Sequence, residues 1–236
     1  MEGFIRIDSL GNISGLTGED AFPVEPVFID EETELLQENC IKYLGKKGCN
    51  NVTNPDIIDD STYELIQEGI DEARALSDFR MAFSVLDLEH VDDSYSVANH
   101  AIDLTGKSLK NLFDKNHSEC VLITASTLGD GIDKRVSIYK NSNTARMVLL
   151  NACSSAYVEY LTDISEKLIL RACNLINPSF RFAPGYGDVP LSRQRQIFSI
   201  FEKQSDKLKI ELNDNNFMYP IKSMTGITGC RRVSEK

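Results

Sequence analysis

The sequence has no tryptophan, only three histidines, and no pair of cysteines close enough for a metal clip. Protein-borne zinc and iron–sulfur sites need such ligands at short spacing, so we expect no metal site. Scattered thiols instead indicate free cysteines in a reducing compartment. The six cysteines are Cys40, Cys49, Cys120, Cys153, Cys173 and Cys230.

Long apolar runs and excess positive charge are also missing. No apolar stretch approaches 20 residues, so we expect no transmembrane helix. The segment from Met1 to Leu10 has no signal-peptide core, which favours a cytoplasmic protein. The formal net charge of −11 argues against nucleic acid or an anionic membrane as a partner, because binding phosphates needs a basic surface.

The first third of the chain divides into two expected parts. Glycine and proline punctuate residues 1–26, which predicts an irregular lead-in with an edge strand at Phe4 to Ile7 as its one candidate element. Residues 27–78 form an expected helical lobe. One helix starts at Asp30 and ends before Gly45, and a second begins with Ser61 and Glu64 as a capping box.

From Phe79 onward the hydrophobic period changes, and residues 79–236 predict an α+β core that forms one compact domain with 27–78. We expect a mixed, mainly antiparallel sheet with long packed helices. The expected strands are 79–85, 96–104, 120–125, 208–212 and 222–229, the last two joined as a closing hairpin. The expected helices are 105–113, 132–139, 144–173, which is the longest, and 191–201.

A ten-residue stretch, 181–190, follows the longest expected helix. Two prolines and two glycines exclude a regular helix or a central strand there. The same stretch carries Arg181, Tyr186 and Asp188, and its glycines allow the backbone to approach a ligand closely. Composition alone leaves two interpretations open, a rigid connector or a ligand cradle.

The segment Arg181-Phe182-Ala183-Pro184-Gly185-Tyr186 resembles the RxxxGY signature of the activation domain of cobalamin-dependent methionine synthase. Thr127-Leu128-Gly129 with Asp133, and the helical segment from Ala156 to Leu161, resemble that domain upstream. The segment from Leu212 to Ser223 resembles its LTESxxMxPxxS hairpin downstream. The resemblance covers the second half of the chain, and the first half is similar to short stand-alone relatives of the domain.

The resemblance implies a function. An activation domain binds S-adenosylmethionine and caps the cobalamin domain of methionine synthase, so that an electron and the methyl group of S-adenosylmethionine restore methylcobalamin. By this resemblance Arg181 pairs with the ligand carboxylate, and the backbone of Ala183, Pro184, Gly185 and Tyr186 contacts the adenosine part. Asp214 supplies the acidic group of the hairpin motif. The cobalamin is held by the partner.

One departure from the family keeps two functions open. The family has a ligand-binding glutamate on the long helix, where this chain has Ser155, and Glu159 aligns with a different residue. The protein is therefore either a stand-alone activation subunit acting in trans, or a non-catalytic module that caps a corrinoid protein or methyltransferase without S-adenosylmethionine. No catalytic set such as Ser/His/Asp can be identified, so an independent enzyme is the least favoured reading.

Overall fold

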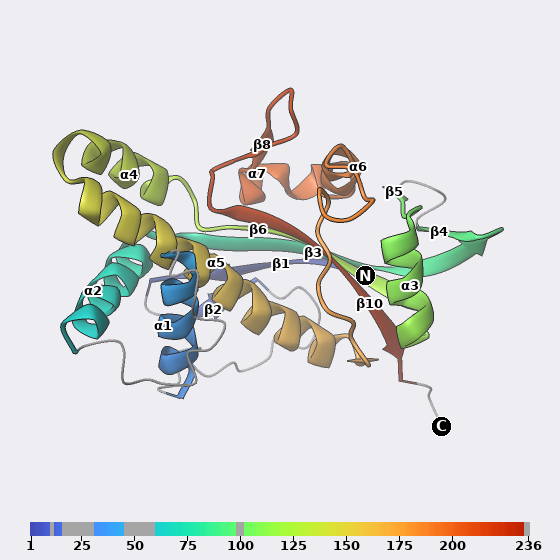
Figure 1. Cartoon of the computed structure of the whole chain (residues 1–236). Helices are drawn as coiled ribbons and strands as arrows, with labels where there is room; N and C mark the ends of the chain where they lie inside the picture. Colours follow the sequence, from blue (N-terminus) through green and yellow to red (C-terminus); the bar gives the residue numbers. More distant parts are fainter. Residues whose placement is uncertain (10–11, 16–30, 45–59, 98–101, 234–236) are drawn as a thin grey trace.

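The computed structural model describes residues 1–9, 12–15, 31–44, 60–97 and 102–233. Its centre is an antiparallel sheet in the strand order β2-β1-β3-β6-β10-β7, with β4 and β5 extending from β3 (Figure 1). The strands are β1 Glu2–Ile7, β2 Ile13–Ser14, β3 Phe79–Val91, β4 Ser94–Val97, β5 Ile102–Asp103, β6 Cys120–Thr127, β7 Leu175–Ile176 and β10 Ser223–Arg232. The expected α+β class is confirmed, and every pairing in the described sheet is antiparallel.

Helices cover both faces of this sheet (Figure 1). Side chains of α1, α2, α4 and α5 share one hydrophobic core with the sheet, and side chains of α3, α6 and α7 share a second core on the other face. The helices are α1 Glu31–Tyr43, α2 Asp60–Leu76, α3 Lys107–Asn116, α4 Gly131–Ser142, α5 Thr144–Ala172, α6 Arg193–Ile200 and α7 Ser205–Leu208. The central strands of the sheet therefore lie between two layers of helices.

Strand β6 shows how the sequence divides between the two cores. Successive side chains of a strand point to opposite faces, so Leu122 enters the core beneath α5 while Val121 and Ile123 enter the core beneath α3 and α6. All eight residues of β6 are buried. This double coverage explains why its sequence is a continuous run of small and apolar residues instead of an alternating one.

The expected helices at 30–44, 61–73 and 144–173 agree with α1, α2 and α5 within a few residues. The start of α2 differs in detail. Helix α2 begins at Asp60, so Ser61 lies inside its first turn and is not the N-cap.

The N-terminal strand belongs to the sheet more fully than expected. Strand β1 pairs with β3 along its whole length and with β2 on its other side, and Ile5 and Ile7 are buried. The expected strand at Phe4 to Ile7 is therefore present as β1, and β2 pairs with it only at Arg6 and Ile7, so most of β1 lies along the margin of the described sheet. The expected lead-in at 10–11 and 16–26 lies outside the described residues.

The expected closing hairpin is wrong. Leu208 ends helix α7, and Lys209 follows in the left-handed region with a φ of 52°, so only Glu211–Leu212 remains as strand β8. Strand β8 pairs with β9, Met218–Tyr219, outside the main sheet. The final strand, β10, instead pairs with β6 over eight residues. The alternating pattern of its sequence did not determine which strand β10 pairs with.

Candidate functional site

A cleft of about 300 Å³ lies at an open edge of β10, between α5 and α6. Segment 181–190 crosses β10 there (Figure 1). Phe182 exchanges two backbone hydrogen bonds with Ile227, at 2.9 and 2.8 Å. Beyond this bridge, towards Ser223, no described strand covers that edge of β10. The cleft is therefore bounded by a helix on each side, an edge strand, and the crossing segment.

The crossing segment is held in a fixed shape. Gly185 has a φ of +94° and donates its N–H to the carbonyl of Val189 at 2.9 Å, which closes a tight turn. Asp188 lies at the start of α3 and accepts hydrogen bonds from the backbone N–H groups of Lys107 and Ser108. Hydrogen bonds from Ser108 and these amides hold the pKa of Asp188 below its usual value. The segment is thus anchored on α3 while its middle faces the cleft.

Helix α5 provides a wall that carries charge. Ser155, Val158 and Glu159 line the cleft at helical spacing, so they share one face. Glu159 accepts a short hydrogen bond from the hydroxyl of Tyr43 in α1. Burial and the adjacent Glu159 carboxylate raise the pKa of Tyr43. A carboxylate therefore faces the cleft one helical turn after Ser155.

Lys222 brings a positive charge to the same wall. Its Nζ donates to the Asn151 carbonyl at 2.9 Å, to Asn151 Oδ1 at 2.8 Å and to Ser155 Oγ at 2.7 Å. Burial lowers the pKa of Lys222, because its nearest acceptors are neutral and Asp133 offsets the desolvation only in part. Three acceptors around one nitrogen fit an ammonium with three N–H groups. The Ser155 hydroxyl thus accepts a hydrogen bond from the Lys222 ammonium.

Arg181 lies beside the cleft and not in its lining. Its Nη1 is 2.7 Å from Asp163 Oδ1 and 3.1 Å from Glu166 Oε2. Desolvation lowers the pKa of Arg181, but these two carboxylates outweigh it and the pKa is raised. Burial also raises the pKa of Glu166, in spite of the nearby guanidinium. The aliphatic part of Arg181 crosses β10 at Gly226, where a Cβ would lie 2.4 Å from Arg181 Cδ.

The structure brings together some of the residues that the sequence selects. Ala183, Pro184 and Tyr186 line the cleft, and Gly185 lies in the same turn. Asp214 does not line it. Asp214 lies in the turn between β8 and β9, where Arg195 donates to its backbone carbonyl at 3.3 Å. The ligand contacts expected of Arg181 and Asp214 therefore stay predictions.

Other lining residues were not among the predicted ligand contacts. Tyr43 comes from α1, Gln194 from α6, Met218 from β9, and Lys222 immediately precedes β10. They are far apart in the chain, and only the packing of α1 on α5 and the entry of β10 into the sheet bring them together. Met218 and Lys222 lie within the segment that resembles the hairpin motif, and Glu159 carried a signal because it lies four residues after Ser155 on one helix face.

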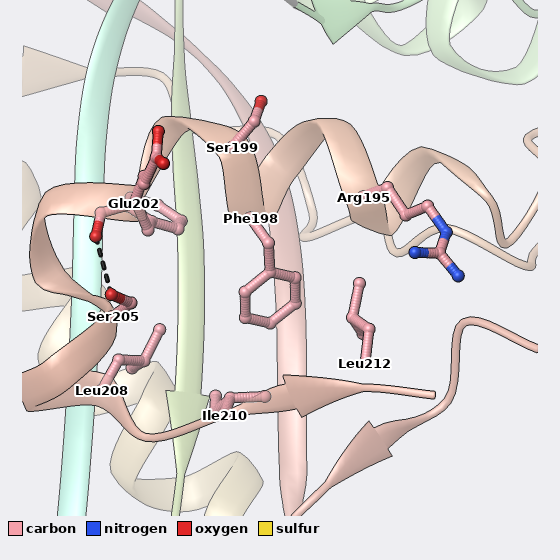
Figure 2. Close-up of a pocket in the computed structure, with 9 residues that line it drawn as sticks. Arg195, Phe198, Ser199, Glu202, Ser205, Leu208, Ile210 and Leu212 are labelled. Carbon is pink, nitrogen blue, oxygen red and sulfur yellow. Dashed lines mark hydrogen bonds between the residues drawn. The ribbon is translucent and has the colours of Figure 1, made fainter. Parts of the chain in front are cut away.

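A second cavity, of about 420 Å³, lies between α6, α7 and β8. Figure 2 shows Phe198 pointing from α6 towards Ile210 and Leu212, with Arg195 and Glu202 at opposite ends. Ser205 donates to the Glu202 carbonyl at 2.8 Å. Among the described residues, no buried polar atom lacking a partner belongs to this lining. The cleft beside β10 is therefore the better candidate site.

Two further searches concern metals and membranes. Within the described ranges, no three His, Cys, Asp or Glu side chains gather in a way that would hold a metal ion. None of the helices in that part of the chain has the length and apolar character needed to cross a membrane.

Comparison with known proteins supports the fold. No family model and no curated protein matches the sequence. The chain is similar to a crystal structure of the MetH reactivation domain bound to AdoHcy, with a TM-score of 0.50 and 14% sequence identity. The similarity covers 76% of this chain and 69% of that one. The chain therefore shares the fold of a reactivation domain.

Proposed function

We propose that this protein binds S-adenosylmethionine in the cleft beside β10 and acts as a stand-alone activation subunit. In this role it supports reductive remethylation of the cobalamin of methionine synthase in trans. One observation carries the proposal: segment 183–186, α5 and the open edge of β10 form a cleft on the fold of a reactivation domain that was solved with AdoHcy bound.

The charges of the cleft suit a ligand with an amino-acid end. S-adenosylmethionine carries an ammonium, a carboxylate and a sulfonium. Glu159 faces the cleft and is placed to accept from the ligand ammonium. All three N–H groups of Lys222 donate to acceptors within the chain. Lys222 therefore contributes a positive electrostatic potential to the cleft and no direct hydrogen bond to the ligand. The volume of about 300 Å³ is at the low end for a small-molecule pocket, which fits a ligand lying half exposed at its rim.

Arg181 keeps the role of carboxylate contact in this proposal. Both of its ion pairs are made by Nη1. The N–H groups on Nε and Nη2 are then the donors for a ligand carboxylate, and a planar guanidinium can offer two parallel bonds. Glu166 and Asp163 would hold the guanidinium in place while it binds.

The rim of the cleft supports the choice of partner. Tyr43, Tyr186 and Ile221 line the cleft, and the side chains of Tyr186 and Ile221 are 70% and 66% exposed. Exposed apolar side chains gathered around a pocket indicate a surface that another molecule covers. We propose the cobalamin-binding domain of methionine synthase, or of a related corrinoid protein, as that partner. The partner's cobalamin supplies the methyl acceptor and an external donor supplies the electron.

Isothermal titration with S-adenosylmethionine tests ligand binding. The wild type is expected to bind saturably, and Arg181→Lys, which keeps the charge near Glu166 but loses the planar fork, is expected to bind about tenfold more weakly. Arg195→Lys is the matched control, because Arg195 lines the second cavity, and its affinity should equal that of the wild type. Absence of heat for the folded wild type would sink this half of the proposal.

The action in trans needs its own assay. Methionine synthase lacking its activation domain would be inactivated by oxidation and supplied with an electron donor, S-adenosylmethionine and this protein. Recovery of turnover is expected only when the protein is present. Recovery without the protein, or none with it in spite of measured ligand binding, would contradict the proposed role.

A binding module without chemistry is the second candidate. It is favoured by the internal pairing of Arg181 with Asp163 and Glu166, and by Ser155 serving Lys222 where the family has a glutamate. A pull-down with a cobalamin-binding domain separates the two functions. Equal capture with and without S-adenosylmethionine supports the module, whereas capture that depends on the ligand supports the activation subunit.

A further inference from the structure

We propose that the second cavity is a binding site for a small organic monocarboxylate with an apolar body. The carboxylate pairs with Arg195, and the body lies on the apolar side chains that α6, α7 and β8 present to the cavity. The second cavity and the cleft beside β10 share no lining residue. The inference therefore goes beyond the proposed function and does not depend on it.

The interior of the cavity is apolar. Figure 2 shows the ring of Phe198, on α6, turned towards Ile210 and Leu212, with Leu208 at the end of α7 beside them. Phe198 and Leu212 are only half-buried, so they have apolar surface left for a ligand to cover. The volume of about 420 Å³ lies in the range of small-molecule pockets, which are mainly apolar with a few polar groups that orient the ligand.

Arg195 supplies the polar group that orients the ligand. Its Nη2 donates to the backbone carbonyls of Asn213 and Asp214, at 3.2 and 3.3 Å. In the described part of the chain no carboxylate forms an ion pair with Arg195, and its Nε and Nη1 have no hydrogen-bond partner there. Figure 2 shows the guanidinium at the end of the cavity where Leu212 lies. A tethered cation with unused N–H groups beside an apolar floor fits a carboxylate that carries an apolar body.

The other end of the cavity limits the charge of the ligand. Glu202 lines that end, and Leu208 and Ile210 lie between it and Arg195 (Figure 2). A dicarboxylate would bring its second charge onto apolar side chains or towards Glu202, and a buried charge without a partner is costly. An alkylamine could pair only with Glu202, whose carboxylate accepts no hydrogen bond from any described residue. Arg195 is held by two carbonyls and loses less conformational freedom on binding, so the cavity favours one negative charge, at the Arg195 end.

Amide proton–nitrogen NMR both locates the site and measures its affinity. The probes titrated into the folded wild type are butanoate, hexanoate, 1-hexanol, hexylamine and hexanedioate. We expect hexanoate to shift amides of residues 193–212 saturably, and affinity to rise about fourfold for each methylene added between butanoate and hexanoate. Hexanoate should bind about threefold more tightly than 1-hexanol, a modest factor because Arg195 is exposed. Hexylamine and hexanedioate should bind more weakly than hexanoate.

Substitutions separate the charge from the apolar floor. Arg195→Gln should reduce the ratio of hexanoate affinity to 1-hexanol affinity from about three to about one. This ratio is insensitive to a loosening of α6, because such a change would weaken both ligands alike. Arg231→Gln is the matched control, since Arg231 pairs with Glu119 and lines neither cavity, and its ratio should equal that of the wild type. Leu212→Ser should lower the gain per methylene and leave the ratio unchanged.

The inference is overturned if hexanoate gives no saturable shifts, if it binds no more tightly than 1-hexanol, or if the ratio survives in Arg195→Gln. Hexylamine as the tightest ligand, or a gain per methylene that is unchanged in Leu212→Ser, would also overturn it. S-adenosylmethionine should bind equally with and without saturating hexanoate. Competition between the two, or hexanoate shifts confined to residues 183–186 and 222–225, would place the carboxylate in the cleft, which rejects this inference and leaves the proposed function standing.

Discussion

Removing Arg181 should destabilise the protein through Glu166. The Glu166 side chain is 11% exposed, and its two charge-assisted neighbours are Arg181 Nη1 at 3.1 Å and Thr124 Oγ1 at 3.2 Å. Asp163, the other partner of Arg181, is 57% exposed and can be solvated once the arginine is gone. The loss of stability in Arg181→Met therefore comes from the buried Glu166 carboxylate, which is left without its cationic partner. Removing one member of a buried pair costs about 3–5 kcal/mol, and we expect about 3 kcal/mol because Thr124 remains.

The loss should depend on pH in a defined direction. Burial already holds the pKa of Glu166 above its usual value, and removing the guanidinium raises this pKa further. A carboxyl whose folded-state pKa exceeds the unfolded one binds its proton more readily when folded. The penalty is therefore full above the folded-state pKa and is relieved as the pH falls below it. The deficit of Arg181→Met should shrink between pH 8 and pH 5.

Urea denaturation at both pH values measures this effect. With a slope of about 2–3 kcal/mol/M, a loss of 3 kcal/mol lowers the midpoint by roughly 1 M at pH 8. The double variant Arg181→Met/Glu166→Gln should recover most of it. Arg231→Met is the control, because its ion pair with Glu119 is exposed and worth less than about 1 kcal/mol. A loss below about 1 kcal/mol at pH 8, or one that does not change with pH, would refute the reasoning.

Three further predictions follow from single contacts. Gly226→Ala should lower the free energy of unfolding by about 2 kcal/mol in urea, because its Cβ would meet Arg181 Cδ at 2.4 Å and Thr124 Oγ1 at 2.6 Å; an unchanged midpoint would contradict this contact. Asp188→Asn should lower the melting temperature at pH 7, because it weakens the acceptor at the start of α3. Since the pKa of Asp188 is depressed, its contribution is lost as the pH falls through that pKa, so the gap to the wild type should close in acid, and a constant gap would argue against the cap. A thiol reagent should reach Cys40, Cys120, Cys153 and Cys230 only after unfolding, because all four are buried and free; rapid reaction of these thiols in the native protein would show that the cores open.

The sequence predicts the helices and the class of the fold well, because those depend on local periodicity. The stripe of α5 and the apolar face of α1 are visible in the order of residues alone. Strand pairing is a different matter. The alternation at 208–212 is compatible with a strand, but Leu208 is the last residue of helix α7 and its side chain is buried in the core. Local sequence allows both a helix and a strand at this position, and the tertiary packing determines which one forms.

The candidate site is predictable only in part for the same reason. Ala183, Pro184 and Tyr186 stand out because their loop has an unusual local composition. Gln194 and Thr225 also line the cleft but do not stand out, because a glutamine in a helix and a threonine in a strand are ordinary residues until the fold brings them together. Arg181 stands out by its motif, but the pairing with Glu166 depends on the rotation of α5 against the sheet.

The position of β10 has a consequence for how the protein is made. Strand β6 is buried along its whole length, and its partner β10 is synthesised only after α4, α5, α6 and α7. Until then β6 has one unpaired edge, which is a template for pairing with another chain. The same late strand supplies Thr225 and the edge of the cleft. A nascent chain therefore acquires its site and loses its aggregation-prone edge in one step, and a ligand that binds the site would favour completion of the sheet over aggregation.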